Sequence, residues 1–196
     1  MSSTLAPAVG PSRRRLTGRQ ADTVQRLAEA TVEEVRARGY EGLTVRIVAR
    51  RAGVAPATAY TYFASKDHLI AEVFWRRLQA LPEVRVDRRR GAAVRIADAL
   101  RDVGLLVADE PELAAACTAA MLATDPDVKH LRDRIGARLR ERLATALGDD
   151  GDPAVLRVLE LAFSGAMLSA GMGHLAYGDV VDRMSEAVAL LVGVRS

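Results

Sequence analysis

Cysteine is almost absent from this 196-residue chain, since Cys117 is the only one. A single cysteine excludes an intrachain disulfide, which fits a reducing compartment, so we expect a cytoplasmic protein. Aromatic residues are also scarce, at 4% of the chain, while 49% of the residues are hydrophobic. Ala, Leu, Val and Arg are prominent, and Ala, Leu and Arg are strong helix formers. The composition therefore predicts an all-α protein with a substantial core.

Signals for export and membrane insertion are missing as well. The first residues lack a basic start followed by an apolar run, so we expect no secretory signal. The most apolar late stretch, 161–177, contains His174 and many small residues and is short for a membrane span. We therefore predict no contact with a membrane.

The residue patterns of common enzymes and metal sites are not found. His68, His130 and His174 are far apart, and none belongs to a His-x3-His pair. There is no Gly-x-Ser-x-Gly elbow and no phosphate-binding glycine loop. Cys117 lies in an Ala-rich segment, which is typical of a small buried hydrophobe rather than a nucleophile. We predict no catalysis, no metal and no cofactor.

Charge is divided unevenly along the chain. Residues 1–90 contain 17 Lys and Arg against 9 Asp and Glu, a net charge of +8, whereas residues 91–196 contain 11 against 16, a net charge of −5. Arginine bias in a GC-rich genome would not separate the signs in this way. The division indicates a first half that faces nucleic acid and a second half with another task.

The stretch 44–63 predicts two short helices joined by a tight turn. Thr44 can cap the first helix with its hydroxyl, and Gly53 suits a turn that needs a left-handed residue. Pro56 is placed where a second helix should start. That second helix carries hydroxyls and amphipathic rings with Phe63 as one large anchor, as expected of a helix that lies in a DNA groove.

Helices are predicted on both sides of this stretch. One spans about 17–38 and another runs from 66 to about 82. The pairs Glu110-Pro111, Asp125-Pro126 and Asp152-Pro153 place a carboxylate before a proline at a helix start. With these starts we expect helices near 91–108, 111–123, 126–147 and 153–177, and a last one from 179 to about 193, so about nine in all.

A family resemblance rests on the segment GYEGLTVRIVARRAGVAPATAYTYFASKDHL. It resembles the DNA-binding domain of the TetR family of transcriptional regulators, over roughly residues 16–75. Two residues depart from the family pattern, because Ala55 replaces a usual capping Ser and Ala59 replaces a larger aliphatic residue. The matched positions are Gly39, Tyr40, Thr44, Ile47, Val48, Ala49, Ala52, Gly53, Val54, Thr58, Tyr60, Tyr62, Phe63, Lys66 and Leu69.

The resemblance implies an all-α homodimer with three parts. Residues 1–15 form a disordered basic arm, residues 16–75 a three-helix helix-turn-helix head, and residues 76–196 an effector-binding and dimerisation domain. Arg13, Arg14 and Arg15 of the arm either touch DNA or belong to a tail that contacts nothing. The last two helices show a faint similarity to an actinobacterial branch that senses lipid-like or acyl-CoA ligands.

Seven residues are expected to contact DNA. We assign Thr44, Tyr62 and Lys66 to phosphates, with Arg46 beside them, because hydroxyl, phenol and cationic groups reach phosphate oxygens. The expected base readers are Ala57, Thr58 and Tyr60. As an alternative, Tyr60 packs in the protein or contacts the sugar-phosphate backbone. The alternative for Lys66 is an ordinary surface lysine without a DNA contact. Arg50 and Arg51 fit either DNA contact or plain solvent exposure.

The second half is expected to hold an apolar pocket and a dimer interface. The alternative for each pocket residue is that it belongs to the hydrophobic core and lines no pocket. The alternative for the interface residues is that they pack within one subunit. The pocket candidates are Trp75, Leu105, Cys117, Met121, Leu122, Leu139, Phe163, Met167 and Met172. The interface candidates are Ala162, Gly165, Ala166, Ser169, Gly173, Val180, Met184, Val188 and Leu191.

The expected function is a ligand-responsive transcriptional regulator, with double-stranded operator DNA and a small apolar effector as partners. Repression of a palindromic operator, released by the effector, is what the resemblance implies. A non-specific or architectural DNA-binding protein is the alternative, and so is a ligand-binding protein without operator recognition.

Overall fold

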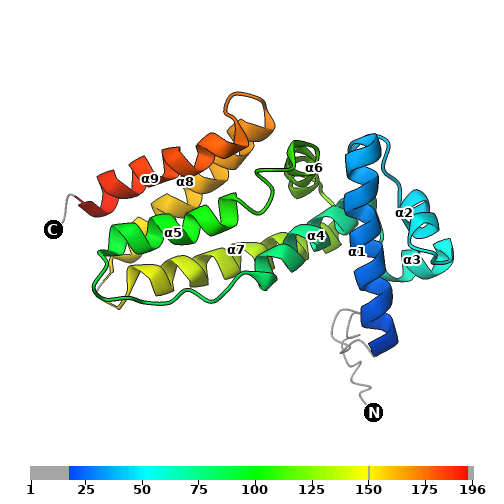
Figure 1. Cartoon of the computed structure of the whole chain (residues 1–196), viewed down its shortest axis with the longest axis horizontal. Helices are drawn as coiled ribbons and strands as arrows, with labels where there is room; N and C mark the ends of the chain where they lie inside the picture. The colour runs from blue at the N-terminus through cyan, green and yellow to red at the C-terminus, as the bar shows by residue number, and fades with distance from the viewer. Residues whose placement is uncertain (1–17, 150, 194–196) are drawn as a thin grey trace, which may run out of the picture.

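The computed structural model describes residues 18–149 and 151–193, and every regular element in these ranges is an α-helix (Figure 1). The all-α prediction is confirmed. The arginines at 13–15 lie outside the described residues. The helices are α1 (Gly18–Arg38), α2 (Val45–Arg51), α3 (Pro56–Tyr62), α4 (Lys66–Ala80), α5 (Ala92–Gly104), α6 (Pro111–Met121), α7 (Pro126–Leu147), α8 (Pro153–Gly171) and α9 (Tyr177–Gly193).

Helices α1, α2 and α3 form a small unit at one end of the molecule, which we call the head (Figure 1). The Ile47 N–H donates to Thr44 Oγ1 at 3.2 Å, so Thr44 caps α2 as predicted. Gly53 has a φ of 63°, which a residue with a side chain rarely adopts, and it makes the turn before α3. Ala59 and Phe63 are buried, so the inner side of α3 seats on the head core.

Helix α4 connects the head to the rest of the chain. The His68 N–H donates to Ser65 Oγ at 3.1 Å, so Ser65 caps the start of α4. On one side α4 packs against α1, and on the other it packs against α6 and α7. Leu69, Ile70 and Leu78 are completely buried between these neighbours. A shift of α4 therefore changes contacts in the head as well as beyond it.

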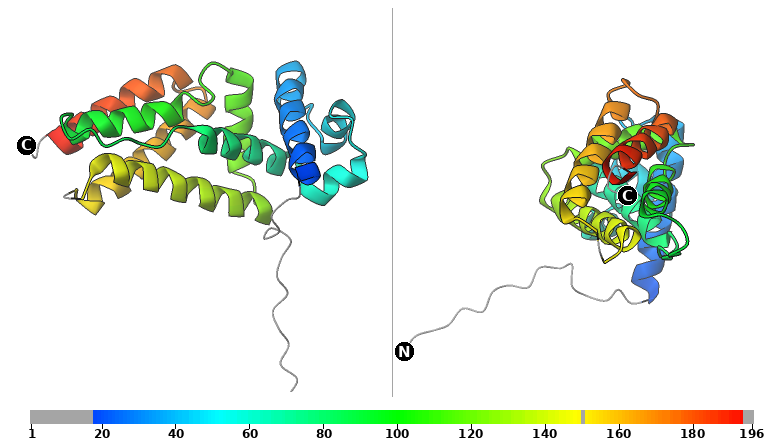
Figure 2. Two further views of the ribbon diagram at one scale, coloured as in Figure 1. Left: turned by 60° about the horizontal axis from the view of Figure 1, so that its bottom comes forward. Right: turned by 90° about the vertical axis from the view of Figure 1, so that its left-hand side faces the viewer.

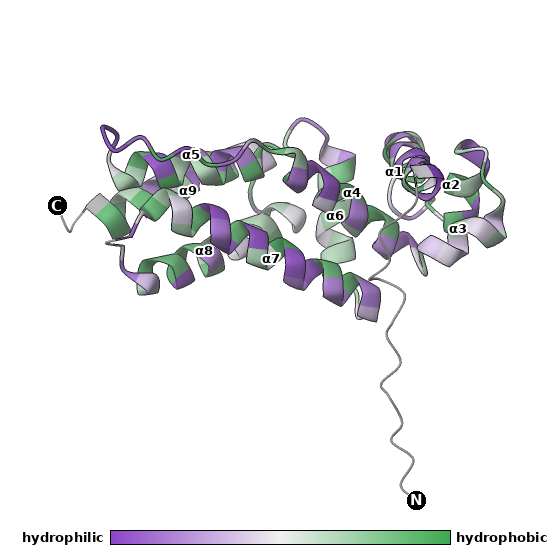
Figure 3. Cartoon of the chain, turned by 90° about the horizontal axis from the view of Figure 1, so that it is seen from below, coloured by the Kyte–Doolittle hydropathy of each residue, from purple (hydrophilic) through white to green (hydrophobic). Residues whose placement is uncertain are grey.

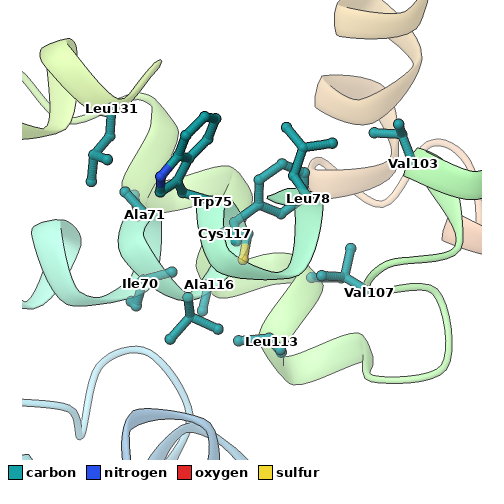
Figure 4. Close-up of a cluster of buried hydrophobic side chains, with 14 of the residues drawn as sticks. Ile70, Ala71, Trp75, Leu78, Val103, Val107, Leu113, Ala116, Cys117 and Leu131 are labelled. Carbon is teal, nitrogen blue, oxygen red and sulfur yellow. The ribbon is translucent and has the colours of Figure 1, made fainter. Parts of the chain in front are cut away.

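Helices α5 to α9 form an elongated bundle, the body, that extends away from the head (Figure 2). In the body α9 packs against α5 and α8, while α5 also packs against α7. Hydrophilic and hydrophobic bands alternate along α7, as expected of a helix with one solvent face (Figure 3). Figure 4 shows a buried cluster shared by α4, α5, α6 and α7, with Trp75, Leu78, Val103, Cys117 and Leu131 among its side chains.

The predicted end of the eighth helix is wrong. We expected this helix to reach residue 177, but α8 ends at Gly171 and α9 begins at Tyr177. Gly173 adopts a φ of 79°, and the His174 N–H donates to the Ser169 carbonyl at 3.0 Å. This is the usual glycine stop at a helix C-terminus. The apolar composition of 161–177 concealed it.

Candidate nucleic-acid interface and ligand pocket

The outer surface of α3 carries the three expected base readers. Ala57, Thr58 and Tyr60 are exposed, and 53% of Tyr60 is accessible to solvent, whereas Ala59 is fully buried. Tyr60 therefore does not pack in the head core. Their contact with bases stays a prediction. The start of α3 has Pro56 at its first position and no side-chain hydrogen bond from Ala55, as the departure at Ala55 predicted.

Two of the residues that are expected to contact DNA phosphates are exposed to solvent. Thr44 and Arg46 are exposed, and Arg46 makes no ion pair within the described residues. Tyr62 is partly buried and packs against the hydrophobic core, so less of its phenol faces solvent. Arg46 is thus a free cation beside α3, as phosphate binding requires.

Lys66 is engaged within the head. Its Nζ donates to the Tyr40 carbonyl at 3.1 Å and lies 3.8 Å from the centroid of the Tyr40 ring. The Tyr40 hydroxyl donates to Asp67 Oδ1 at 2.7 Å. Burial, followed by the hydrogen bond to Asp67, raises the pKa of Tyr40 to about 12. Lys66 therefore has a structural role that the sequence did not indicate, beside any role at a phosphate.

The two ambiguous arginines of α2 differ in their surroundings. Arg51 pairs with Glu34 through Nε, and its Nη1 lies 3.0 Å from Glu33 Oε2. The pKa of the buried Glu34 carboxyl is lowered, and the hydrogen bond from Arg51 is the largest cause. Arg50 is exposed and forms no ion pair among the described residues. Arg51 therefore stabilises the head. Of these two arginines, Arg50 is the one whose side chain is left available to DNA.

Two sets of polar contacts join the head and α4 to the body. Ser65 Oγ donates to Asp125 Oδ2 at 2.6 Å, which connects the first turns of α4 and α7. Glu110, at the start of α6, accepts from Arg36 of α1 and Arg77 of α4, each at 2.6 Å. Burial is the largest single effect and raises the pKa of Glu110, but Arg77 and Arg36 together outweigh it and hold this pKa below its usual value. The head is thus held by charged groups at two helix starts.

An apolar cavity of about 350 Å³ lies inside the body, between α4 and α8. Six of the nine predicted pocket residues line it: Cys117, Met121, Leu122, Leu139, Phe163 and Met167. Sequence reasoning missed Phe74, Leu78, Val103, Thr118, Arg132, Ile135, Gly136, Ser164 and Leu168. Burial raises the pKa of the Cys117 thiol to about 12, so this side chain is a neutral part of the wall.

Three predicted pocket residues lie elsewhere, and the prediction is wrong for them. Leu105 and Met172 are on the surface, with 50% and 57% of each side chain exposed. Leu105 follows the last turn of α5, and Met172 follows the last turn of α8. Trp75 is buried, but its ring faces Arg134, whose guanidinium carbon lies 4.3 Å from the ring centroid. Periodicity marked these residues as apolar without showing which side of each helix meets the cavity.

A larger hollow of about 920 Å³ lies at the far end of the body. Arg88, Arg95 and Asp149 contribute to its wall, together with exposed loop backbone. Arg95 donates to the carbonyls of Ala146 and Leu147, at 2.8 and 3.2 Å, and so caps α7. Since effector sites are mostly apolar, the smaller cavity is the better candidate.

The predicted dimer surface is wrong for three residues of α9. Val180, Met184 and Val188 are buried inside the subunit, where α9 packs against α5 and α8, so no partner can reach them. Leu191 also packs against the core. On α8, Ala162, Ala166 and Ser169 are half-buried, while Gly165 and, just beyond the helix, Gly173 are exposed.

The exposed apolar residues of α8 and its C-cap form a line in which only Gly165 was among the predicted interface residues. Val158, Leu161, Gly165, Leu168 and Met172 are all exposed, with 74% of Leu161 accessible. Their spacing alternates between three and four residues, the repeat by which one helix pairs with another. Among the described helices, only α8 is long and apolar enough to cross a membrane, and this line contributes to that composition. We call these five residues the α8 seam.

Comparison with known proteins gives consistent matches. The model of the bacterial regulatory proteins of the tetR family matches residues 27–73. The HTH-type transcriptional regulator Rv0767c of Mycobacterium tuberculosis is 46% identical over 176 residues, 89% of this chain and 82% of the relative. The repressor KstR of Rhodococcus jostii is 29% identical over 98% of this chain and 93% of its own length.

Solved structures show the same fold. A TetR transcriptional regulator from Rhodococcus sp. RHA1 superposes with a TM-score of 0.73 at 22% identity, over 90% of this chain and 98% of that one. FadR from Bacillus subtilis, in complex with stearoyl-CoA, has a TM-score of 0.58 at 18% identity, over 86% and 97% of the two chains. With its helix-turn-helix head and these relatives, the chain belongs to the TetR family of bacterial transcriptional regulators.

Proposed function

We propose that this regulator is a homodimeric, ligand-responsive repressor that leaves a palindromic operator when a small apolar effector binds. The observation that carries the proposal is the cavity of about 350 Å³ against α4, the helix that holds the head. Residues 16–75 would serve as the DNA-binding domain and residues 76–196 as the effector-binding and dimerisation domain. The protein would act in the cytoplasm.

Two relatives support this assignment. KstR of Rhodococcus jostii, which matches nearly the whole chain, is a repressor by name. FadR from Bacillus subtilis has the same fold and was solved with stearoyl-CoA bound. A repressor whose body takes an apolar ligand is therefore consistent with both relatives.

The position of α4 supports coupling between the two sites. Phe74 and Leu78 of α4 line the cavity, while Ser65 and Lys66 at its other end belong to the head–body junction and the head. An effector that favours one position of α4 over another shifts the equilibrium between the two by its difference in affinity. Effector and operator then weaken each other's binding to the same extent.

The α8 seam supports a homodimer. A single head buries little DNA surface, so TetR-type heads are expected to act in pairs on half-sites roughly 34–36 Å apart. Pairing of two seams would remove Leu161 and Leu168 from water and bring the bodies together through Gly165. An apolar helix face of this length is otherwise unusual on a monomer.

The decisive experiment is selection of binding sites from random double-stranded DNA, followed by fluorescence anisotropy with the selected site and a scrambled duplex at one salt concentration. We expect an affinity at least about 10³-fold higher for the selected site, and a palindrome in the selected sequences. Equal affinities would instead favour the architectural alternative. No binding to either duplex would favour a ligand-binding protein without operator recognition.

A further inference from the structure

Arg132 is the only residue with a charged side chain among those that line the apolar cavity. Its Nη1 donates to the carbonyls of Met121 and Ala123, at 2.6 and 3.3 Å, at the end of α6. These two bonds hold the guanidinium in place at the cavity wall. They satisfy only part of a group that carries five N–H donors.

The positive charge of Arg132 has no carboxylate partner within the described residues. Two later arginines of α7 do form ion pairs, since Arg138 pairs with Glu83 and Glu141, and Arg140 pairs with Glu160, whereas Arg134 lies over the Trp75 ring. The acidic neighbour Asp133 is 2.6 Å from Lys129 instead. A half-buried cation beside an apolar cavity is costly unless an anion compensates it. Among the described residues no carboxylate forms an ion pair with Arg132, and the charge of Asp133, which Arg132 affects at longer range, is shared with Lys129.

The cavity also has a direction. Leu78, Val103 and Leu139 are buried and form an apolar floor, whereas Leu122, which is not part of the α8 seam, is exposed and forms part of the rim. Arg132 bonds to the carbonyls on either side of Leu122, so its guanidinium lies at the rim. A ligand that enters from solvent thus meets a cation at the entrance and a buried apolar floor beyond it.

We propose that the effector is amphipathic, with a hydrocarbon part on the floor and a single oxyanion, a carboxylate or a phosphate, bound by Arg132. The unused N–H groups of the guanidinium suit either oxyanion, and charge-assisted hydrogen bonds of this kind are the strong ones. This inference depends on the proposed effector function and narrows it, because a purely apolar effector would leave the Arg132 charge uncompensated.

The test uses three probes that share one hydrocarbon chain: dodecanoate, dodecyl phosphate and the uncharged methyl dodecanoate. Calorimetry below their micelle concentrations measures the binding of each to the full chain. We expect at least one oxyanion to bind the unmodified protein about tenfold to a hundredfold more tightly than the ester. Whichever oxyanion binds more tightly identifies the head group.

Substitutions of Arg132 distinguish a role in ligand binding from a role in capping the end of α6. Arg132→Gln should bring the oxyanion affinity down to that of the ester, while Arg132→Lys retains part of the preference. Arg183→Gln, which removes an exposed arginine of α9, is the matched control and should keep the full preference. If Arg132 only capped α6, Arg132→Gln would weaken all three probes equally.

The inference is overturned if the ester binds the unmodified protein as tightly as the oxyanions, if the preference survives in Arg132→Gln, or if no probe binds. None of these results touches operator recognition, which anisotropy with the selected DNA measures separately. Conversely, the absence of sequence-specific DNA binding would overturn the proposed function. The calorimetric preference for an oxyanion over the ester would still be tested independently.

Discussion

Ser65 and Asp125 each cap a different helix, and a hydrogen bond of 2.6 Å from Ser65 Oγ to Asp125 Oδ2 joins the two caps. Ser65 accepts from the His68 N–H at the start of α4, and Asp125 accepts from the Asp127 N–H at the start of α7. One serine thus stabilises a helix end and connects α4, next to the head, to α7, which lines the cavity.

A double-mutant cycle should detect this connection. Ser65→Ala should lower the free energy of unfolding by about 0.5–2 kcal/mol through loss of the cap, and by a further amount through loss of the hydrogen bond to Asp125. Together with Asp125→Ala it should show a coupling energy of about 1.5–3 kcal/mol, because the bond involves a charged acceptor. Urea unfolding measures each term. Ser65→Ala combined with Asp182→Asn, an exposed residue of α9, should be additive, and additivity of the Ser65–Asp125 pair would contradict the connection.

Acid should weaken the same junction. The hydrogen bond from Ser65, followed by those from the N–H groups of Asp127 and Val128, lowers the pKa of Asp125 against an opposing effect of burial. The ionised Asp125 carboxylate stabilises the folded state fully above the pKa of an unfolded aspartate, about 3.9. This stabilisation is lost as the pH falls through the lower pKa of Asp125 in the folded state. Urea midpoints measured below about pH 5 should therefore fall less steeply in Asp125→Asn than in the unmodified protein. Asp182→Asn should leave this slope unchanged.

The α8 seam makes a clear prediction about assembly. Leu161→Glu should convert the dimer to a monomer and weaken operator binding more than about tenfold, because pairing would bury a carboxylate without a partner. The subunit should still fold, since 74% of Leu161 is exposed. Sedimentation at micromolar concentration and anisotropy measure the two effects. Leu105→Glu changes an exposed leucine that directly follows α5, with 50% of it accessible, and should leave the dimer intact. A dimeric Leu161→Glu would refute the seam.

Arg46 provides a test of phosphate contact that leaves the fold intact. Arg46→Ala should weaken binding to all DNA sequences and reduce the slope of log affinity against log salt by about one for each head, so by about two for the dimer. Its unfolding midpoint should not change, because Arg46 is exposed and makes no ion pair among the described residues. An unchanged salt slope would remove Arg46 from the interface.

Lys66 should behave differently. Lys66→Ala removes the contact with the Tyr40 ring and carbonyl, so we expect a lower unfolding midpoint as well as weaker, less salt-dependent DNA binding. Thermal unfolding and anisotropy separate the two effects. Lower stability with an unchanged salt slope would show that Lys66 serves only the head, and a change limited to operator preference would contradict the phosphate role.

Much of the head follows from the sequence by itself. The Thr44 cap, the left-handed Gly53 and the proline start of α3 depend on atoms within a few residues of one another, so local rules predict them. The family pattern over 39–69 extends this to a TetR head. The charge division likewise needs only the order of residues.

Tertiary structure decided what each apolar or charged side chain faces. Val188 and Leu161 look alike in sequence, yet one is buried against neighbouring helices and the other lies on the seam. Arg132 and Arg140 occur on one helix, but only Arg140 has a carboxylate within reach. Helices α8 and α9 carry apolar residues around much of their circumference, so periodicity alone cannot select the inward side. That selection depends on which helices pack against them, and it places the cavity, its cation and the exposed α8 seam.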